Sequence, residues 1–327
     1  MAIVDGNDSA VLRHAAAELA AGELVAFPTE TVYGLGARAD DDAAVAKIFA
    51  AKGRPTDHPL IVHVNDVAAA RAFAAEWPAS AQKLADAFWP GPLTVIVPRR
   101  SGMGSASAAG QTSIGLRCPA HPVARALLDA AAALGVAGVS GPSANRFGRI
   151  SPTTAAHVHE DFGDGFTIVD GGECDAGIES AIVDCSRGAP ALLRPGVLTR
   201  EQLEAALGQP LREAGRDAPR ASGTLEAHYA PRAKLRLMPA DQLRAALGIL
   251  ARSGASPVAV YFRTVAPGRG VHACRAMPDN PLAAAHELFS ALRELDASGT
   301  RLIWVETPPD AAEWEGVRDR LQRAAAA

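Results

Sequence analysis

The sequence predicts an α/β protein made of two domains. Its 327 residues correspond to about two domains at roughly 150 residues each. Apolar strand-like runs alternate with helical patterns over most of the chain. The stretch 209–232 has no sustained period and is rich in Pro, Gly, Arg and Ala, which is typical of an interdomain linker. We therefore expect a first domain at 1–208, a linker and possible lid at 209–232, and a second domain at 233–327.

In the first domain, short apolar runs that end at Pro or polar residues predict strands, and capped segments with a 3.6-residue period predict helices. The expected strands lie at 23–28, 59–64, 92–98, 112–119, 136–140, 166–170, 179–185 and 190–194. The expected helices lie at 8–21, 41–51, 66–75, 79–88, 121–133 and 199–207, with another beginning at Pro152. We expect Gly34 and Gly36, after the first strand, to form a tight turn.

In the second domain, strands and helices alternate more regularly than in the first. Strands are expected at 234–238, 257–262 and 301–306, and helices at 240–251, 281–296 and 310–323. Alternating strands and helices predict a small parallel sheet.

Composition excludes several classes of function. Thirty-two basic and 36 acidic residues give a net charge of −4, which excludes coating nucleic acid by bulk charge but leaves room for a local basic cleft. The 4 cysteines form no C-x-x-C pair, so neither a zinc knuckle nor a disulfide framework is indicated, and such thiols suit a reducing compartment. The sequence shows no signal-peptide pattern and no apolar run near the ~20 residues of a membrane span. A cytoplasmic protein without a membrane segment is expected.

The common nucleotide and nucleophile signatures are missing. There is no G-x-x-x-x-G-K-[ST] loop, and Gly34-x-Gly36-x-x-Ala39 lacks the later acidic strand end of a dinucleotide site. No Ser-His-Asp or Cys-His order stands out, so we expect no covalent nucleophile. His157 and His159 lack partners for a zinc pattern, and no metal site is predicted.

Two cations end the helix at 41–51. Lys52 falls on the apolar face formed by Val45, Ile48 and Phe49, and Arg54 follows after Gly53. They are either snorkelling cations that complement the helix C-terminus or a phosphate clamp, and the sequence leaves both interpretations open.

Other polar residues gather at strand ends, where open α/β sheets bind ligands. The hydroxyls are Thr31, Ser143, Ser151 and Ser180, accompanied by Asn145, and the further cations are Arg117 and Arg194. Together with Lys52 and Arg54 they predict a cleft for a polyanion and a small polar molecule. Capping of loops by Ser and Asn is the alternative. His63 is either a core histidine or a donor in the cleft.

Five segments in this order resemble the motifs of the YrdC-like domain: "PTETVYGLG" from Pro28, "KGRPTDHPLIVHV" from Lys52, "PSANRFGRISPTTAAHV" from Pro142, "ESAIVD" from Glu179 and "LLRPG" from Leu192. "HYAP" at 228–231, followed by a small α/β domain, resembles the two-domain Sua5 type of threonylcarbamoyl-AMP synthases. The resemblance covers nearly the whole chain. It implies an open, twisted mixed sheet with a central electropositive cavity, followed by a Rossmann-like domain.

The resemblance also implies a reaction. L-threonine, bicarbonate and ATP are joined into threonylcarbamoyl-adenylate, with release of pyrophosphate and water. The product serves N6-threonylcarbamoylation of adenosine 37 in tRNAs that read codons beginning with A, through the downstream tRNA threonylcarbamoyl-transferase machinery. Mg2+ would accompany ATP, without a dedicated protein cage.

Site residues are implied by the same matches. Lys52 and Arg54 carry the catalytic role. The threonine site consists of Thr31, His63, Arg117 and Ser180. The nucleotide site consists of Lys52, Arg54, His58, Ser113, Ser143, Asn145, Ser151, Arg194 and Tyr229, with Tyr229 closing over the cavity from the linker.

Three departures from the family pattern stand out: His58 replaces an Asn, Ala181 replaces a Thr, and Arg146-Phe147 replaces Leu-Ser. One alternative function is a double-stranded RNA- or tRNA-binding module without adenylate chemistry. Weak binding of RNA is also considered for the enzyme itself. A second is the carbamoyltransferase of hydrogenase maturation, whose zinc fingers the cysteine spacing excludes. A third is a regulatory nucleotide-binding protein.

Overall fold

The computed structural model describes residues 2–215, 217–253 and 257–327. The chain forms two compact units. The N-terminal unit contains the chain up to Phe147 and Ser151–Thr224, and the C-terminal unit contains Gly148–Ile150 and Leu225–Ala327. The segment 209–232 is therefore divided after Thr224, and its first part packs within the N-terminal unit.

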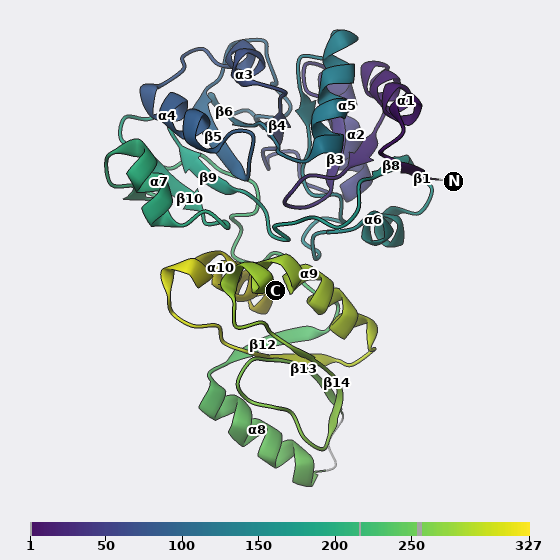
Figure 1. Ribbon diagram of the computed structural model, residues 1–327, viewed down its shortest axis with the longest axis vertical. Coiled ribbons are helices and arrows are strands. Elements are labelled where there is room, and N and C mark those ends of the chain that lie inside the picture. Colours follow the sequence, from purple (N-terminus) through teal and green to yellow (C-terminus); the bar gives the residue numbers. More distant parts are fainter. Residues whose placement is uncertain (1, 216, 254–256) are drawn as a thin grey trace. The chain divides into compact units, whose positions relative to one another are not determined.

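The N-terminal unit is built on a mixed sheet, as the sequence and the resemblance predicted. Among the described residues the sheet has eleven strands in the order β1-β8-β2-β3-β7-β4-β6-β5-β9-β10-β11, with parallel and antiparallel pairs (Figure 1). The strands are β1 (Ile3–Asp5), β2 (Val25–Phe27), β3 (Gly34–Arg38), β4 (Ile61–His63), β5 (Leu93–Pro98), β6 (Ser113–Arg117), β7 (Val139–Ser140), β8 (Thr167–Asp170), β9 (Ala181–Asp184), β10 (Ala191–Arg194) and β11 (Arg212–Glu213).

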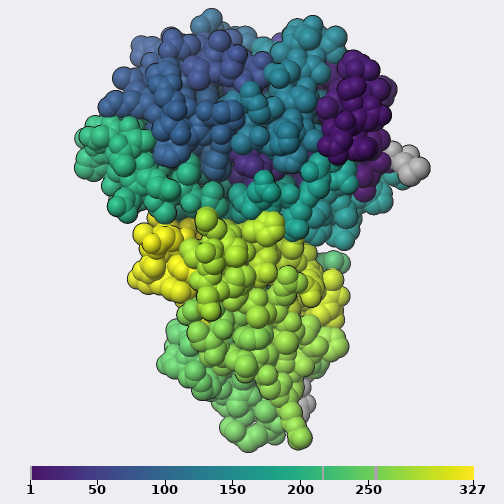
Figure 2. Space-filling model, viewed as in Figure 1, coloured from purple at the N-terminus to yellow at the C-terminus, as the bar shows by residue number. Residues whose placement is uncertain are grey.

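The helices of this unit begin close to where the capping residues predicted. They are α1 (Ser9–Ala20), α2 (Asp42–Lys52), α3 (Val67–Phe73), α4 (Ala79–Phe88), α5 (Pro122–Ala133), α6 (Ala155–Phe162) and α7 (Arg200–Leu207). Asp8 and Asp41 accept backbone N–H groups at the starts of α1 and α2, and Thr199 forms a capping box at α7. Helix α1 packs against α5, and their atoms lie side by side in purple and teal in Figure 2. Helix α6 begins at Ala155 rather than Pro152, because Thr154 supplies the N-cap.

The prediction of a glycine turn after the first strand was wrong. Gly34 and Gly36 lie in β3, which pairs antiparallel with β2. A Cβ on Gly36 would stand 3.0 Å from the Phe27 ring and from the Val25 carbonyl oxygen, so glycine is required by close approach and not by a turn. The turn is formed by the preceding residues, where the Thr29 hydroxyl bonds the backbone of Val32.

The C-terminal unit has the small parallel sheet that was predicted. Its strands are β12 (Lys234–Met238), β13 (Val258–Phe262), β14 (Val271–Ala276) and β15 (Leu302–Glu306), all paired in parallel in the order β12-β15-β13-β14. Helix α8 (Ala240–Ser253) lies on one side of the sheet, and α9 (Pro281–Ala297) and α10 (Glu315–Ala325) lie on the other (Figure 1). Strand β14 was not predicted, since this edge strand alternates half-buried with exposed residues and includes His272 and Arg275. The last predicted helix begins as a 3-10 turn at Ala312–Trp314.

Candidate functional site

Pairing of strands β4 and β6 brings two of the predicted threonine residues together. The parallel register places His63 beside Arg117. The Arg117 guanidinium donates to the Thr31 hydroxyl at 2.8 Å and to Oε1 of Glu30 at 2.7 Å. Both acceptors come from the loop between β2 and β3, so three segments distant in sequence meet around one buried arginine.

The hydrogen bonds around Thr31 have a defined direction. The Thr29 hydroxyl donates its proton to the Val32 carbonyl at 2.7 Å. The 2.8 Å contact between the hydroxyls of Thr29 and Thr31 therefore uses the proton of Thr31. Because Thr31 also accepts from Arg117, its remaining lone pair can only accept a hydrogen bond, as from an N–H or O–H of a ligand.

His63 is a buried histidine at the edge of this network. Its ring is 3% exposed and meets the Phe27 ring edge-on, with centroids 5.6 Å apart. Burial, together with the positive charge of Arg117, lowers the pKa of His63 to about 3, so the imidazole is neutral at neutral pH. A neutral imidazole in this place can donate or accept one hydrogen bond.

This pKa predicts how stability depends on pH. Between pH 6.5 and about 3 the unfolded chain binds a proton at His63 that the folded chain does not, so this residue lowers stability as the pH falls through that window. The loss is about 1.4 kcal/mol per pH unit at most. Urea unfolding at pH 6.5 and pH 4.5 should show a smaller loss for His63→Gln than for the unsubstituted chain. Equal losses would contradict a buried, neutral His63.

A second network joins a predicted threonine residue to a predicted nucleotide residue. The Arg194 guanidinium donates to the Ser180 carbonyl at 3.1 and 2.9 Å and to the Ser180 hydroxyl at 3.2 Å. That hydroxyl lies 2.8 Å from the hydroxyl of Thr94, on β5. Arg194 also donates to the carbonyl of Ser222 at 2.8 Å, which ties the segment after Gly208 to the sheet.

Lys52 organises the loop that carries Ser143 and Asn145. Its ammonium donates to the carbonyl of Ser143 at 2.6 Å and to that of Asn145. Only 3% of Lys52 is exposed, so it does not reach solvent as a snorkelling lysine would. Burial, reinforced by the positive charge of Arg54, holds the pKa of Lys52 well below its usual range.

Arg54 follows the left-handed Gly53 that ends α2. It donates to the carbonyls of Pro59 at 2.9 Å and His58 at 3.3 Å, and its guanidinium carbon lies 5.5 Å from the centroid of the Phe147 ring. The rings of His58 and Phe147 are 5.3 Å apart, so two of the departures from the family pattern contact each other. Burial and the charge of Arg54 lower the pKa of His58.

The remaining predicted nucleotide residues of the N-terminal unit, Ser151, Ser143 and Ser113, each contact a different segment. Ser151 is buried and donates to Glu179 at 2.5 Å, and Glu179 directly precedes Ser180. Ser143 bridges to Gly34, which sets its loop against β3. Ser113 begins β6 and lines a pocket.

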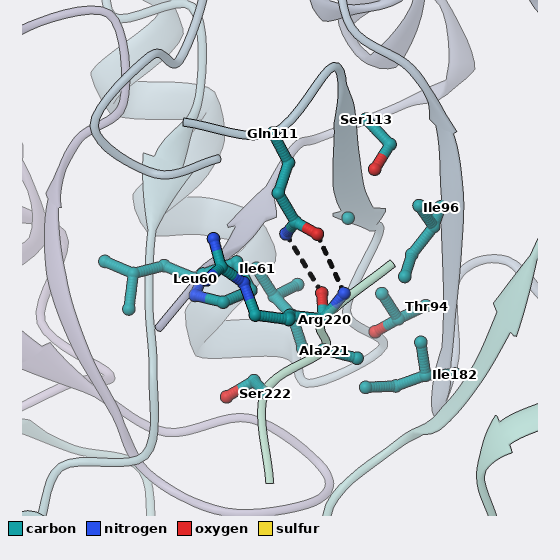
Figure 3. Close-up of a pocket in the computed structure, with 12 residues that line it drawn as sticks. Leu60, Ile61, Thr94, Ile96, Gln111, Ser113, Ile182, Arg220, Ala221 and Ser222 are labelled. Carbon is teal, nitrogen blue, oxygen red and sulfur yellow. Dashed lines mark hydrogen bonds between the residues drawn. The ribbon is translucent and has the colours of Figure 1, made fainter. Parts of the chain in front are cut away.

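That pocket is shown in Figure 3. Its lining includes Thr94 and Ser113 from the sheet and Arg220, Ala221 and Ser222 from the segment after Gly208. The free volume is about 20 Å³, room for about one water molecule. A more open groove of about 460 Å³ shares Ser113 and Arg220 with it. The pocket as it stands is too small for a nucleotide, and residues 220–222 form part of its wall.

The side-chain amide of Gln111 is one of the groups that hold this segment in place. The backbone N–H of Arg220 donates to Oε1 of Gln111 at 2.7 Å, and Nε2 of Gln111 donates to the Arg220 carbonyl at 3.1 Å (Figure 3). Arg220 adds a bond from its guanidinium to the Ala109 carbonyl at 3.1 Å.

Tyr229, unlike the other predicted residues, belongs to the C-terminal unit. It is buried there with φ 61°, and its ring centroid is 5.4 Å from that of Phe289 and 5.5 Å from the guanidinium carbon of Arg320. That it closes over a nucleotide stays a prediction.

Several contributors were not singled out from the sequence. They are Glu30, Thr94, Gln111 and Glu179. The only sequence signal for Glu30 and Glu179 is that they lie within the motifs "PTETVYGLG" and "ESAIVD". Thr94, inside an apolar strand, and Gln111, inside a polar loop, carry no such signal.

Comparisons with known proteins identify the family of this chain. A model of the Sua5/YciO/YrdC family, described as telomere recombination, matches residues 17–196, and one described as threonylcarbamoyl-AMP synthase, C-terminal domain, matches residues 198–326. The chain belongs to the Sua5 family. It is 37% identical over 335 residues to the threonylcarbamoyl-AMP synthase of Pyrococcus abyssi, covering 96% of this chain and 93% of that protein. It is also 37% identical to that of Bacillus subtilis, covering 98% and 94%. The family is one of enzymes.

Solved structures of Sua5 share the fold. Sua5 of P. abyssi complexed with L-threonine matches with a TM-score of 0.88 and 35% identity over 97% of this chain and 95% of that one. A variant of the same protein, with a histidine and the following tyrosine replaced by alanine, matches with a TM-score of 0.89 and 34% identity over 99% and 96%. His228-Tyr229 is the His-Tyr pair of this sequence. No helix among the described residues is long and apolar enough to span a bilayer.

Proposed function

We propose that this chain is an L-threonylcarbamoyladenylate synthase. It makes threonylcarbamoyl-AMP and pyrophosphate from L-threonine, bicarbonate or CO2, and ATP in the cytoplasm. The observation that carries the proposal is the match over nearly the whole chain to Sua5 complexed with L-threonine. It is supported by the Arg117 and Arg194 networks, whose residues are those that the motifs assign to threonine and nucleotide.

The Arg117 network suits an amino acid. A buried guanidinium pairs with a carboxylate, and the acceptor lone pair of Thr31 suits the amine or hydroxyl of threonine. His63, beside Arg117, supplies a further polar group. Because its imidazole is neutral, it adds no second positive charge next to the guanidinium. Ser180 reaches the same substrate from the other network.

The nucleotide side is proposed to consist of residues of the N-terminal unit, namely Lys52, Arg54, His58, Ser113, Ser143, Asn145, Ser151 and Arg194. In this proposal the guanidinium groups of Arg54 and Arg194 bind the phosphates of ATP. Lys52 shapes the loop of Ser143 and Asn145 through its two carbonyl bonds.

The chemistry proceeds in two steps. The threonine amine adds to CO2 and loses a proton, which gives a carbamate. A carbamate oxygen then attacks the α-phosphorus of ATP, a P–O bond forms, and the bond to pyrophosphate breaks. The protein contributes position and charge neutralisation rather than a nucleophile, because the carbamate oxygen is itself the nucleophile and both the carbamate and ATP are anions. Threonylcarbamoyl-AMP then passes to the tRNA threonylcarbamoyl-transferase machinery, and any direct affinity of this chain for RNA is expected to be weak.

Mg2+ fits this arrangement as a companion of ATP. The described residues contain no group of three or more His, Cys, Asp or Glu side chains that could hold a metal ion. Phosphate oxygens and water would therefore supply most ligands, as Mg2+ prefers in such sites. When bound, the ion supplies neutralisation of phosphate charge.

The proposal is tested by incubating the full chain with ATP, Mg2+, bicarbonate and L-threonine and analysing the products by mass spectrometry. Pyrophosphate and a threonylcarbamoyl-adenylate should appear together, and both should vanish when threonine or bicarbonate is omitted. Pyrophosphate or AMP release that ignores threonine would contradict the proposal.

The segment that fills the pocket gives a further prediction. Gln111→Ala removes two hydrogen bonds that hold Arg220 over the pocket, so a larger fraction of molecules should be open to nucleotide. Titration calorimetry with a non-hydrolysable ATP analogue should show binding at least about 5-fold tighter, which is the lower limit for two bonds of roughly 0.5–1.5 kcal/mol each. The control is Gln322→Ala, at an exposed glutamine of α10. Binding that is equal or weaker in Gln111→Ala would count against this segment as a barrier to ATP.

A further inference from the structure

We propose that Glu30 is a positioning residue that orients the Arg117 guanidinium for the carboxylate of the amino-acid substrate. The inference rests on the proposed function, which places threonine on Arg117, and it assigns a role to a residue outside that site.

Glu30 fastens three segments to one another. Its Oε1 accepts from Nη2 of Arg117 at 2.7 Å, and its Oε2 accepts from the backbone N–H of Ala120 at 3.0 Å. Its backbone carbonyl accepts from the N–H of Ala176 at 2.7 Å. The side chains of Arg117 and Glu30 are only 4% and 10% exposed. Both oxygens of the carboxylate are thus committed, and the carboxylate cannot rotate without losing one of the two donors.

The guanidinium is held at each of its three nitrogens. Nε donates to the Gly91 carbonyl at 3.3 Å, Nη1 to Thr31 at 2.8 Å and Nη2 to Glu30. A guanidinium has five N–H groups, so one on Nη1 and one on Nη2 have no partner within the part of the chain described here. Two N–H groups are what a carboxylate accepts from an arginine in a bidentate pair.

Of the three contacts on Arg117, only the one to Glu30 pairs opposite charges. The Gly91 carbonyl and the Thr31 hydroxyl are neutral acceptors, and the contact to Gly91 is long. The Glu30 carboxylate therefore has two effects. It fixes the plane of the Arg117 guanidinium, and it balances the buried positive charge of that group when no substrate is bound. Since Thr31 accepts from the same guanidinium, a displaced Arg117 would also release the Thr31 hydroxyl from its fixed direction.

The test is Glu30→Gln in the full chain. One end of a glutamine amide is a donor, so it would face either Arg117 or the Ala120 N–H with the wrong group. We expect the dissociation constant for L-threonine, measured by calorimetry, to rise about 10-fold or more, as the loss of one charge-assisted bond implies. Binding of the ATP analogue should stay within about 2-fold. The matched control is Glu23→Gln, at an exposed glutamate that pairs with Lys47 at 2.9 Å.

A purely structural role gives a different result. It lowers the fraction of folded protein, and hence kcat, without shifting the KM for threonine relative to that for ATP. Unchanged threonine affinity in folded Glu30→Gln, or an equal loss for both ligands, would overturn the inference. If Glu30→Gln does not fold, Glu30→Asp replaces it. Aspartate keeps the charge but is one methylene shorter, so it cannot meet both donors, and it should bind threonine more weakly than the unsubstituted chain while its binding of the ATP analogue is unchanged.

The proposed function can fail separately. An unsubstituted chain that binds no threonine overturns both proposals. An unsubstituted chain with threonine-dependent turnover, together with normal threonine binding by the folded Glu30 variants, overturns only the role of Glu30.

Discussion

Replacing Arg54 with alanine is expected to abolish adenylate formation while the chain remains folded. Arg54 is proposed to bind the phosphates, and its guanidinium donates to the carbonyls of His58 and Pro59. Two or three hydrogen bonds to charged groups, at roughly 1.5–3 kcal/mol each, would be lost in the transition state. The rate of pyrophosphate release should therefore fall by about 10³-fold or more.

Two further variants sharpen this result. Arg54→Lys keeps the charge but loses the planar fork, so it should recover only a small part of the activity. Arg13→Ala, on the exposed face of α1, is the control for removal of an arginine. Circular dichroism and thermal unfolding would establish that Arg54→Ala is folded. Pyrophosphate release by that folded variant at the rate of the unsubstituted chain would refute the phosphate role of Arg54.

The second large effect concerns the choice of amino acid. Valine has nearly the shape of threonine but no hydroxyl. The proposed threonine site contains the buried hydroxyls of Thr31 and Ser180, already ordered by Arg117 and Thr94. A site built to bond a hydroxyl rejects an analogue that lacks it, because its own buried polar groups are left unpaired. We expect threonine to be preferred over valine by about 10⁴-fold in kcat/KM.

A competition experiment measures this preference. The full chain is given ATP, Mg2+, bicarbonate and a large excess of valine over threonine, and the two adenylates are quantified by mass spectrometry. Adenylates formed in proportion to the amino acids supplied would contradict a site that reads the hydroxyl. Ser186, which lies outside the two networks, is the control position. If the preference for threonine falls in Ser180→Ala and persists in Ser186→Ala, then Ser180 recognises the hydroxyl of the substrate.

Most of the fold could be predicted from local signals. Capping residues such as Asp41 and Thr199 predicted helix starts, and the parallel C-terminal sheet followed from regular alternation. Four strands were missed, namely β1, β3, β11 and β14, and for two of them the structure shows the physical reason. In β3, glycines that usually mark turns are demanded by the Phe27 ring, which lies on the partner strand. In β14, half-exposure at a sheet edge weakens the apolar pattern.

The candidate site was predictable as a set of residues and not as a set of contacts. Motif positions nominated Arg117 and Thr31, but their hydrogen bond spans 86 residues and depends on the pairing of β4 with β6. For the same reason Glu30 could not be separated from the rest of its motif. Lys52 was correctly assigned to the buried face of its helix, but local sequence could not show that its ammonium meets the carbonyls of another loop.

The most direct measurement is a crystal structure of the full chain with L-threonine and a non-hydrolysable ATP analogue. The account predicts the threonine carboxylate on Arg117, the triphosphate beside Arg54 and Arg194, and residues 220–222 withdrawn from the pocket that they now fill. A nucleotide bound elsewhere, such as at the sheet of the C-terminal unit, with 220–222 still held by Gln111, would contradict it.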